Sequence, residues 1–219
     1  FGLATRTPDN WAGQIYGRNS DIFSVNVNPM LSYRVNDMLS IGAGVQAQYF
    51  RANLSQATGP LPGSPSATLK GDSMGVGFNL GMQLRPWTGG SIGIGYRSAI
   101  SEGLEGDLSM FDTSMPAKAT LRTPQLVNFG VRQELTDRFR VMGTVEWTDW
   151  SSINVVPVYS VGTGVQLTTL PLRYRDGWLF SVGGEYDLSS QYTARAGIGY
   201  EIAPVNDMSR DVRMPEPNQ

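Results

Sequence analysis

The sequence predicts an all-β protein, an antiparallel up-and-down β-barrel that crosses a membrane. The first observation is a strict alternation of apolar and polar residues. It is clearest at residues 39–49, where odd positions are apolar and even positions are small or polar. A period of two indicates β-strands, because successive side chains point to opposite faces. The second observation is strand length. Such stretches exceed the roughly 5–6 residues of an ordinary strand and match the roughly 9–11 residues that cross a bilayer in a barrel.

The two faces of the predicted strands differ in charge. In residues 74–84, 139–147 and 192–202 the apolar positions carry no charge, whereas the positions between them include charged residues such as Arg140. Alternation alone leaves open a soluble sandwich, in which the apolar face is the core. Strand length, aromatic residues near strand ends and the arrangement of loops favour a barrel with its apolar face in lipid. We therefore expect the even positions of 74–84 and 192–202, and the odd positions of 39–49 and 139–147, to face lipid.

The expected elements form a meander of about nine strands within one domain, residues 1–219. A first strand at residues 1–5 leads into an irregular stretch at 8–20. Further strands are expected at residues 21–35, 39–54, 72–85, 91–100, 119–135, 139–150, 176–188 and 191–203. Short turns at 36–37, 86–90, 136–137 and 189–190 alternate with long connections at 55–71, 101–118 and 151–175. This alternation is typical of an outer-membrane barrel with short periplasmic turns and long extracellular loops. Because an odd strand number leaves open edges, we expect strands to be missing.

Composition excludes several classes of protein. The 219 residues contain no cysteine and no histidine, which removes disulfides, thiolate sites and the commonest general base and metal ligand. We therefore expect no cofactor, no metal site and no enzyme. A net charge of −2 argues against a nucleic-acid surface. The mean hydropathy of −0.21 is expected when half of each strand is polar. The chain starts at Phe1 without a signal peptide, so we expect a central piece of a longer precursor.

Several motifs, in order along nearly the whole chain, resemble the FadL-type outer-membrane transport proteins, the channels for long-chain fatty acids and for toluene and xylene. They are Phe1–Thr5 with Trp11–Gly13, Asn26–Tyr33 with Leu39–Gly44, Gly77–Gly81, Gly95–Ser98, Glu146–Ser151, and Arg195–Tyr200 before Ala203–Asp207.

This resemblance implies a barrel of 14 strands, plugged by an N-terminal hatch, in the bacterial outer membrane. It also implies passive uptake of hydrophobic compounds, by capture at the loops, binding in a lumen pocket and lateral release. The implied partners are fatty acids, hydrocarbons or detergent, together with outer-membrane lipid, and the implied state is a monomer. The hatch and the first and last strands are expected to lie outside this chain.

Candidate ligand contacts follow from the same resemblance. Leu54 and Leu69 flank the connection at 55–71, where the family lines its pocket, and Leu3 and Ala4 lie where its third strand passes the pocket. The alternative for each leucine is loop packing.

Fatty-acid members pair the ligand carboxylate with basic residues, and the matching positions here are Gln56 and Leu170. Arg173 or Arg175 is therefore the candidate carboxylate ligand, since an arginine fork suits a carboxylate. The alternative is that both arginines pair with lumen acids such as Glu185.

A second reading of the sequence is a structural or adhesion barrel whose long loops bind a partner. Apolar loop faces that converge on a lumen pocket favour uptake, whereas hydrophilic loops favour adhesion. A barrel-embedded hydrolase would need a histidine that this segment lacks. The remaining inward charges have mixed signs on neighbouring strands and predict a cross-strand ladder in the lumen. They are Arg85, Arg97, Arg132, Glu134, Arg140, Glu146, Arg195 and Glu201.

Overall fold

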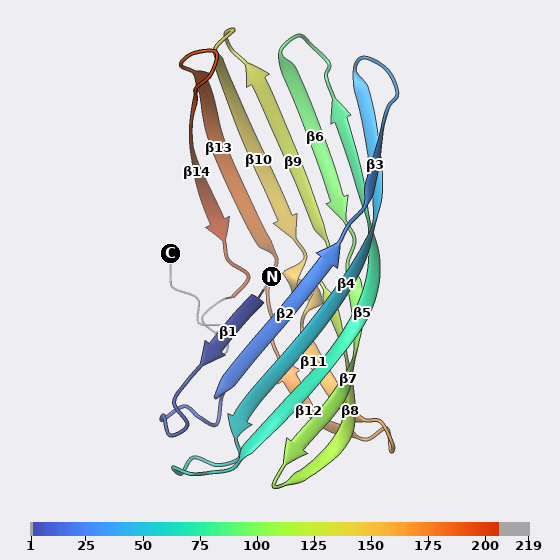
Figure 1. Cartoon of the computed structure of the whole chain (residues 1–219), viewed down its shortest axis with the longest axis vertical. Coiled ribbons are helices and arrows are strands. Elements are labelled where there is room, and N and C mark those ends of the chain that lie inside the picture. The colour runs from blue at the N-terminus through green and yellow to red at the C-terminus, as the bar shows by residue number, and fades with distance from the viewer. Residues whose placement is uncertain (1, 206–219) are drawn as a thin grey trace.

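The structure, a computed structural model, describes residues 2–205. Phe1 and Asn206–Asp207, which belong to predicted features, lie outside this range. Within it the chain forms one antiparallel sheet that curves without closing (Figure 1). The elements are β1 (Gly2–Arg6), β2 (Asn19–Val27), β3 (Met30–Arg34), β4 (Leu39–Ala57), β5 (Ser66–Leu84), β6 (Gly90–Arg97), β7 (Ile100–Met110), β8 (Thr113–Thr123), β9 (Leu126–Glu134), β10 (Phe139–Thr148), the 3₁₀ turn η1 (Trp150–Ser152), β11 (Val155–Ser160), β12 (Gln166–Pro171), β13 (Gly177–Asp187) and β14 (Thr193–Ile202). No helix among residues 2–205 is long and apolar enough to cross a membrane.

Several consecutive elements continue one another as segments of one long strand. Both β2 and β3 pair with β4, and both β6 and β7 pair with β5. On the next long strand, β8 pairs with β7 and β9 pairs with β6. In the same way β11 continues β10, and β12 leads into β13. The two long strands formed in this way pair with each other. Counted as long strands, residues 2–205 form nine, which agrees with the sequence prediction.

The three predicted long connections are largely wrong, because most of their residues are in strands. The connection at 55–71 shrinks to residues 58–65, since β4 and β5 each run for 19 residues. The connection at 101–118 is the β7–β8 hairpin, closed by Phe111 and Asp112 at φ 50° and 59°, as a type I′ turn requires. The connection at 151–175 contains the β11–β12 hairpin.

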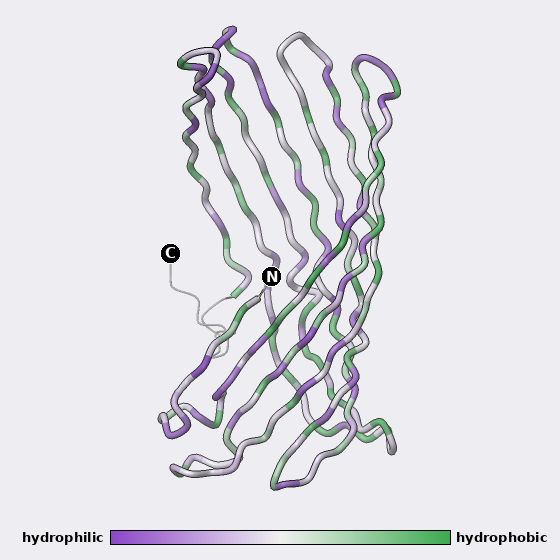
Figure 2. The backbone as a smooth tube through the Cα atoms, viewed as in Figure 1, coloured by the Kyte–Doolittle hydropathy of each residue, from purple (hydrophilic) through white to green (hydrophobic). Residues whose placement is uncertain are grey.

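We call the end with turns β3–β4, β5–β6, β9–β10 and β13–β14 the short-turn half, and the other end the long-loop half (Figure 1). Hydrophobic and hydrophilic residues alternate along the strands of both (Figure 2). In the short-turn half the apolar side chains of all strands meet in register on one face, the outer face. One row of cross-strand partners is Tyr33, Ile41, Met82, Ile94, Phe129, Val145, Phe180 and Tyr200. The predicted lipid-facing sets all lie on this face.

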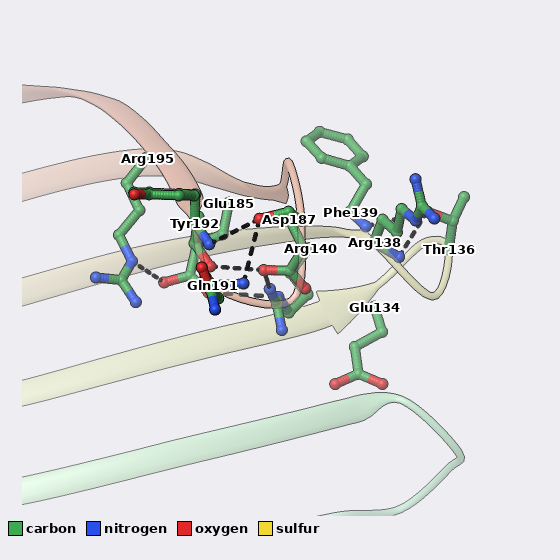
Figure 3. Close-up of polar contacts among 12 residues, drawn as sticks. Glu134, Thr136, Arg138, Phe139, Arg140, Glu185, Asp187, Gln191, Tyr192 and Arg195 are labelled. Atoms are coloured by element: carbon green, nitrogen blue, oxygen red, sulfur yellow. Dashed lines mark hydrogen bonds and ion pairs between the residues drawn. The ribbon is translucent and has the colours of Figure 1, made fainter.

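The inner face of the short-turn half carries the charges. Glu134, Arg140, Glu185 and Arg195 are successive cross-strand partners of alternating sign. Arg140 Nε lies 3.4 Å from Glu185, Arg195 Nε lies 2.7 Å from the same carboxylate, and Arg140 also pairs with Asp187 (Figure 3). The predicted cross-strand ladder is therefore present at this end.

In the long-loop half the chemistry of the two faces is reversed. The outer face is charged, with Arg51, Asp72, Glu105 and Lys118 as successive cross-strand partners, all exposed. The inner face is apolar. Its side chains include Phe50 at 8%, Ile100 at 2% and Val158 at 0% exposure, and it surrounds a cavity.

Two devices produce this reversal. In β4 the backbone is continuous and the sequence changes phase, because odd positions are apolar up to Tyr49 and even positions from Phe50 onward. Between β6 and β7 the sequence keeps its phase and the backbone changes. From Asn79↔Arg97 to Asp72↔Glu105, β5 advances seven residues and its neighbour eight. One extra residue is a β-bulge, and it moves the following side chains to the other face.

Candidate functional site: the inner cavity

The inner face of the long-loop half encloses a cavity of about 350 Å³. This volume lies within the roughly 300–1,000 Å³ typical of small-molecule sites. Most lining side chains are apolar and come from every long strand between β1 and β12. The larger ones are Leu3, Ile22, Phe50, Leu54, Leu69, Ile100, Leu104, Leu121, Trp150, Ile153, Val156, Val158, Leu170 and Leu172. The cavity can therefore bury an apolar molecule on all sides that the described strands cover.

The floor of the cavity, towards the short-turn half, is polar. Gln46, Gln48, Arg97 and Ser98 line it. Arg97 Nε donates to Gln46 Oε1 at 2.6 Å, and Asn26 Nδ2 donates to Gln46 Oε1 at 3.2 Å and to Gln48 Oε1 at 3.0 Å. These bonds fix the amide orientations, so the floor is a preorganised polar layer beneath an apolar chamber.

Behind this floor lies Glu102, which is fully buried. Gln48 Nε2 donates to its Oε1 at 3.1 Å and Ser73 Oγ donates to its Oε2 at 2.5 Å. Gly75 makes room for it, because a Cβ there would lie 2.9 Å from Glu102 Oε2 and 2.3 Å from Ile100 Cγ2. Both carboxylate oxygens of Glu102 thus accept hydrogen bonds from neighbouring side chains of the inner face.

The wall beside the floor is closed by η1 and the chain before β13. Trp150 lines the cavity and packs edge-on against Tyr174, with ring centroids 6.2 Å apart. Asp176, which lies outside the strands, accepts hydrogen bonds from the Ser151 amide at 3.2 Å and the Trp147 indole at 3.0 Å. Hydrogen bonds from Ser151 and Trp147 hold the pKa of Asp176 below its usual value. The Asp176 carboxylate thus connects η1 and the end of β10 to the chain before β13.

At the long-loop end a buried pair joins two loops. Arg18 Nη2 donates to Gln14 Oε1 at 2.6 Å, and Gln14 Nε2 donates to the carbonyl oxygens of Pro60 and Leu61. Arg18 Nη1 also donates to Ser66 Oγ at 2.7 Å. These bonds hold the connection between β4 and β5 against the chain before β2, so the two loops form one rim.

The structure places three of the predicted contact residues on the cavity wall. Leu3, Leu54 and Leu69 all line it. Ala4 does not, because it alternates with Leu3 and is exposed on the other face of β1. Whether any of these residues binds a ligand stays a prediction.

Gln56, Arg173 and Arg175 are not among the lining residues. Arg175 Nε donates to the Ala203 carbonyl at 2.9 Å, and Arg173, at φ 49°, is exposed. Neither arginine pairs with Glu185, which is held by Arg140 and Arg195 at the short-turn end. The neighbours Leu172 and Tyr174 do line the cavity, so the chain passes the wall with the arginines turned away.

The sequence prediction missed the polar floor. The sequence places Arg97 in the cross-strand ladder, yet it forms no ion pair among residues 2–205. A usable signal is the change of phase at Tyr49 and Phe50, which marks where the inner face turns apolar. No group of three or more acidic residues within residues 2–205 is arranged to hold a metal ion.

The sequence model of the family described as "Outer membrane protein transport protein (OMPP1/FadL/TodX)" matches residues 1–218. The chain belongs to this family. Family and fold place it in the bacterial outer membrane.

Individual relatives agree with this assignment. The long-chain fatty acid transport protein of Escherichia coli O6:H1 is 24% identical over an alignment of 258 residues including gaps. The alignment covers 99% of this chain and 58% of that protein. The crystal structure of a Pseudomonas aeruginosa FadL homologue superposes with a TM-score of 0.88 at 25% identity, covering 98% of this chain and 57% of that one.

The Ralstonia pickettii toluene transporter TbuX has a TM-score of 0.68 at 20% identity, over 84% of this chain and 57% of that one, and supports the fold alone. The chain spans less than two thirds of the length of each of these proteins.

Proposed function

We propose that the complete protein takes up hydrophobic compounds, long-chain fatty acids or aromatic hydrocarbons, through the outer membrane without chemical change. The observation that carries the proposal is the apolar cavity on the inner face of the long-loop half, in a chain of a transport family. Burying apolar surface contributes about 25 cal/mol per Å², so such a wall retains apolar molecules without any charged contact. A relative named for long-chain fatty acid transport and the family description, which covers FadL and TodX, support this range of cargo.

The proposed path begins at the long-loop end, which we assign to the outside. Exposed apolar side chains at the hairpin tips, including Leu61, Phe111 and Val161, would collect cargo there. Cargo then enters the cavity past Leu54 and Leu69 and leaves sideways into lipid. No step needs a catalytic group, so we propose a channel and no enzyme. We also propose that the channel is a monomer, as the family resemblance implies.

The alternative function, an adhesion or structural barrel, predicts hydrophilic loops without a pocket behind them. The apolar tips and the cavity beneath them favour uptake instead. The cavity wall would have no role in adhesion, which makes the wall the right place for a test.

The test compares two neighbouring residues on opposite faces of β5. Leu69 lines the cavity, while the Lys70 side chain belongs to the outer, charged face by strand alternation. In cells that depend on the complete protein for uptake, Leu69→Glu should reduce the uptake rate of radiolabelled fatty acid or toluene several-fold. Lys70→Glu, which places the same glutamate side chain on the opposite face one residue away, should leave the rate unchanged. Equal uptake by both variants and the parent would contradict a transport role for the cavity.

A further inference from the structure

The cavity is polar at one end only, and that end carries a cation. Apart from Lys70, Arg97 and Lys118, no charged residue lines it within residues 2–205. Lys70 and Lys118 alternate with the wall residues Leu69 and Ala117, so their ammonium groups belong to the outer face. Arg97 lies on the inner face, where its cross-strand partner on β5 is the buried Asn79. It is thus the cation that faces the chamber.

The guanidinium of Arg97 is held in place and still has donors to spare. Its Nε is fixed by Gln46 Oε1 at 2.6 Å. No carboxylate within residues 2–205 lies within 4.0 Å of it, and its two terminal nitrogens have no hydrogen-bond acceptor there. An arginine presents five donors in a rigid fork, and a carboxylate is the acceptor that fits this fork.

The acid nearest in the same polar network does not fill that role. Glu102 is fully buried, and its two oxygens are taken by Gln48 and Ser73. Gln48 stands between Glu102 and the chamber, because it both lines the cavity and donates to that carboxylate. A group entering the cavity therefore meets the amides and Arg97 rather than the acid.

The chamber is long enough for a linear molecule. Its lining on β4 runs from Gln46 to Leu54, eight residue steps, or about 26 Å at roughly 3.3 Å per residue. A long aliphatic chain fits such a chamber, with its polar end at the floor and its tail among the leucines of the long-loop half.

We propose that Arg97 binds the carboxylate of a linear aliphatic acid at the floor of the cavity, with the tail directed towards the long loops. This deepens the proposed function and rests on it. The assignment differs from the sequence-based hypothesis of Arg173 or Arg175, whose side chains lie away from the wall. Selectivity for acids over neutral hydrocarbons of equal length would then come from one side chain.

The experiment measures the binding of palmitic acid and of hexadecanol, which share a 16-carbon chain, to the complete protein in lipid nanodiscs. Arg97→Gln should raise the Kd of the acid about ten- to a hundred-fold, the effect of losing hydrogen bonds to a charged group. The Kd of the alcohol should change less than two-fold. Arg122→Gln, on the outer face of the long-loop half, is the matched control and should change neither constant.

Equal weakening for both ligands, or no weakening for the acid, overturns the proposal for Arg97. A selective loss in Arg173→Gln or Arg175→Gln instead also overturns it. If the parent protein binds neither ligand nor toluene, it is the proposed function that fails. A crystal structure of the parent protein with palmitate needs no variant. A carboxylate within hydrogen-bond distance of Arg97 supports the proposal, and a carboxylate at the long-loop rim refutes it.

Discussion

The short-turn half and the long-loop half use the same sheet with opposite chemistry. In the short-turn half the outer face is apolar and the inner face holds the Arg140–Glu185–Arg195 ion pairs. In the long-loop half the outer face is charged and the inner face is apolar. Apolar side chains on an outer face indicate contact with lipid, and charged side chains indicate contact with water. The outer face of the short-turn half therefore suits lipid, and that of the long-loop half suits water.

The height of the apolar band agrees with this reading. On β5 it runs from Met74 to Leu84, ten residue steps. At roughly 3.3 Å per residue and a tilt of about 40°, the band is about 25 Å tall, the height expected of an outer-membrane barrel. The membrane boundary thus falls near Tyr49, Met74 and the β6–β7 bulge. Most of the cavity then lies beyond the hydrocarbon core, in the part of the barrel that projects from it. Its floor at Gln46, Gln48 and Arg97 reaches the level of the apolar band, since Gln46 pairs with Gly77 and Arg97 with Asn79.

The largest expected effect comes from placing a charge on the inner face of the long-loop half. Val158 is 0% exposed, so Val158→Asp would bury an unpaired carboxylate and should lower the free energy of unfolding by about 3–5 kcal/mol. Thr144→Asp, on the polar inner face of the short-turn half, should change it by less than about 1 kcal/mol. Urea unfolding of the complete protein in lipid vesicles measures both. Similar losses in the two variants would mean that the inner faces do not differ.

The second prediction concerns the outer face. Leu80, near the middle of the apolar band, is 50% exposed. Leu80→Arg should lower the free energy of unfolding in vesicles by about 2–4 kcal/mol, the cost of a cation at the bilayer midplane. Thr120→Arg lies on the outer face of the long-loop half and should stay within about 0.5 kcal/mol of the parent. A comparable cost at Thr120 would place that half in the membrane too.

Sequence periodicity was sufficient for the fold class, the number of long strands and the outer face of the short-turn half. It failed for the connections because the strands continue beyond the residues with clear alternation: β5 begins at Ser66 instead of Asp72, and residues 101–110 and 113–118 lie in β7 and β8. Phe50, Ala52 and Leu54 continue the alternation of β4 on even positions. The change of phase signals a change of surroundings and leaves the strand intact.

The cavity was harder to predict than the sheet. Leu3, Leu54 and Leu69 were found through resemblance, and alternation separates Leu3 from Ala4. The place of Arg97 on the polar floor could not be predicted from the sequence, because the bulge after it decides which side chains join it on the inner face. A bulge depends on the register with the neighbouring strand, and no local pattern around Ser98 encodes that register.

The third prediction uses two glycines of β7 that lie on opposite faces. At Gly106 a Cβ would lie 2.0 Å from the Lys70 carbonyl oxygen, where β7 approaches β5 closely, whereas at Gly103 it would meet nothing within 4 Å. Because backbone atoms are the obstacle, Gly106→Ala should destabilise the sheet by about 1–3 kcal/mol, the cost of overpacking. Gly103→Ala should be neutral. Thermal unfolding of the purified complete protein distinguishes them, and equal midpoints would refute the close approach.

The smallest expected effect is the loss of an ion pair from the inner face of the short-turn half. Arg195 is bound to Glu185 at 2.7 Å, but its side chain is 71% exposed, so water screens the pair. Glu185 keeps Arg140 as a second partner when Arg195 is removed. Arg195→Gln should therefore lower the free energy of unfolding by only about 0.2–1 kcal/mol, and 1 M salt should reduce the difference further. Urea unfolding at low and high salt measures it. A loss above 2 kcal/mol that persists in salt would show that water is excluded from the inner face of the short-turn half as it is from the cavity. The two inner faces would then not differ in their contact with water.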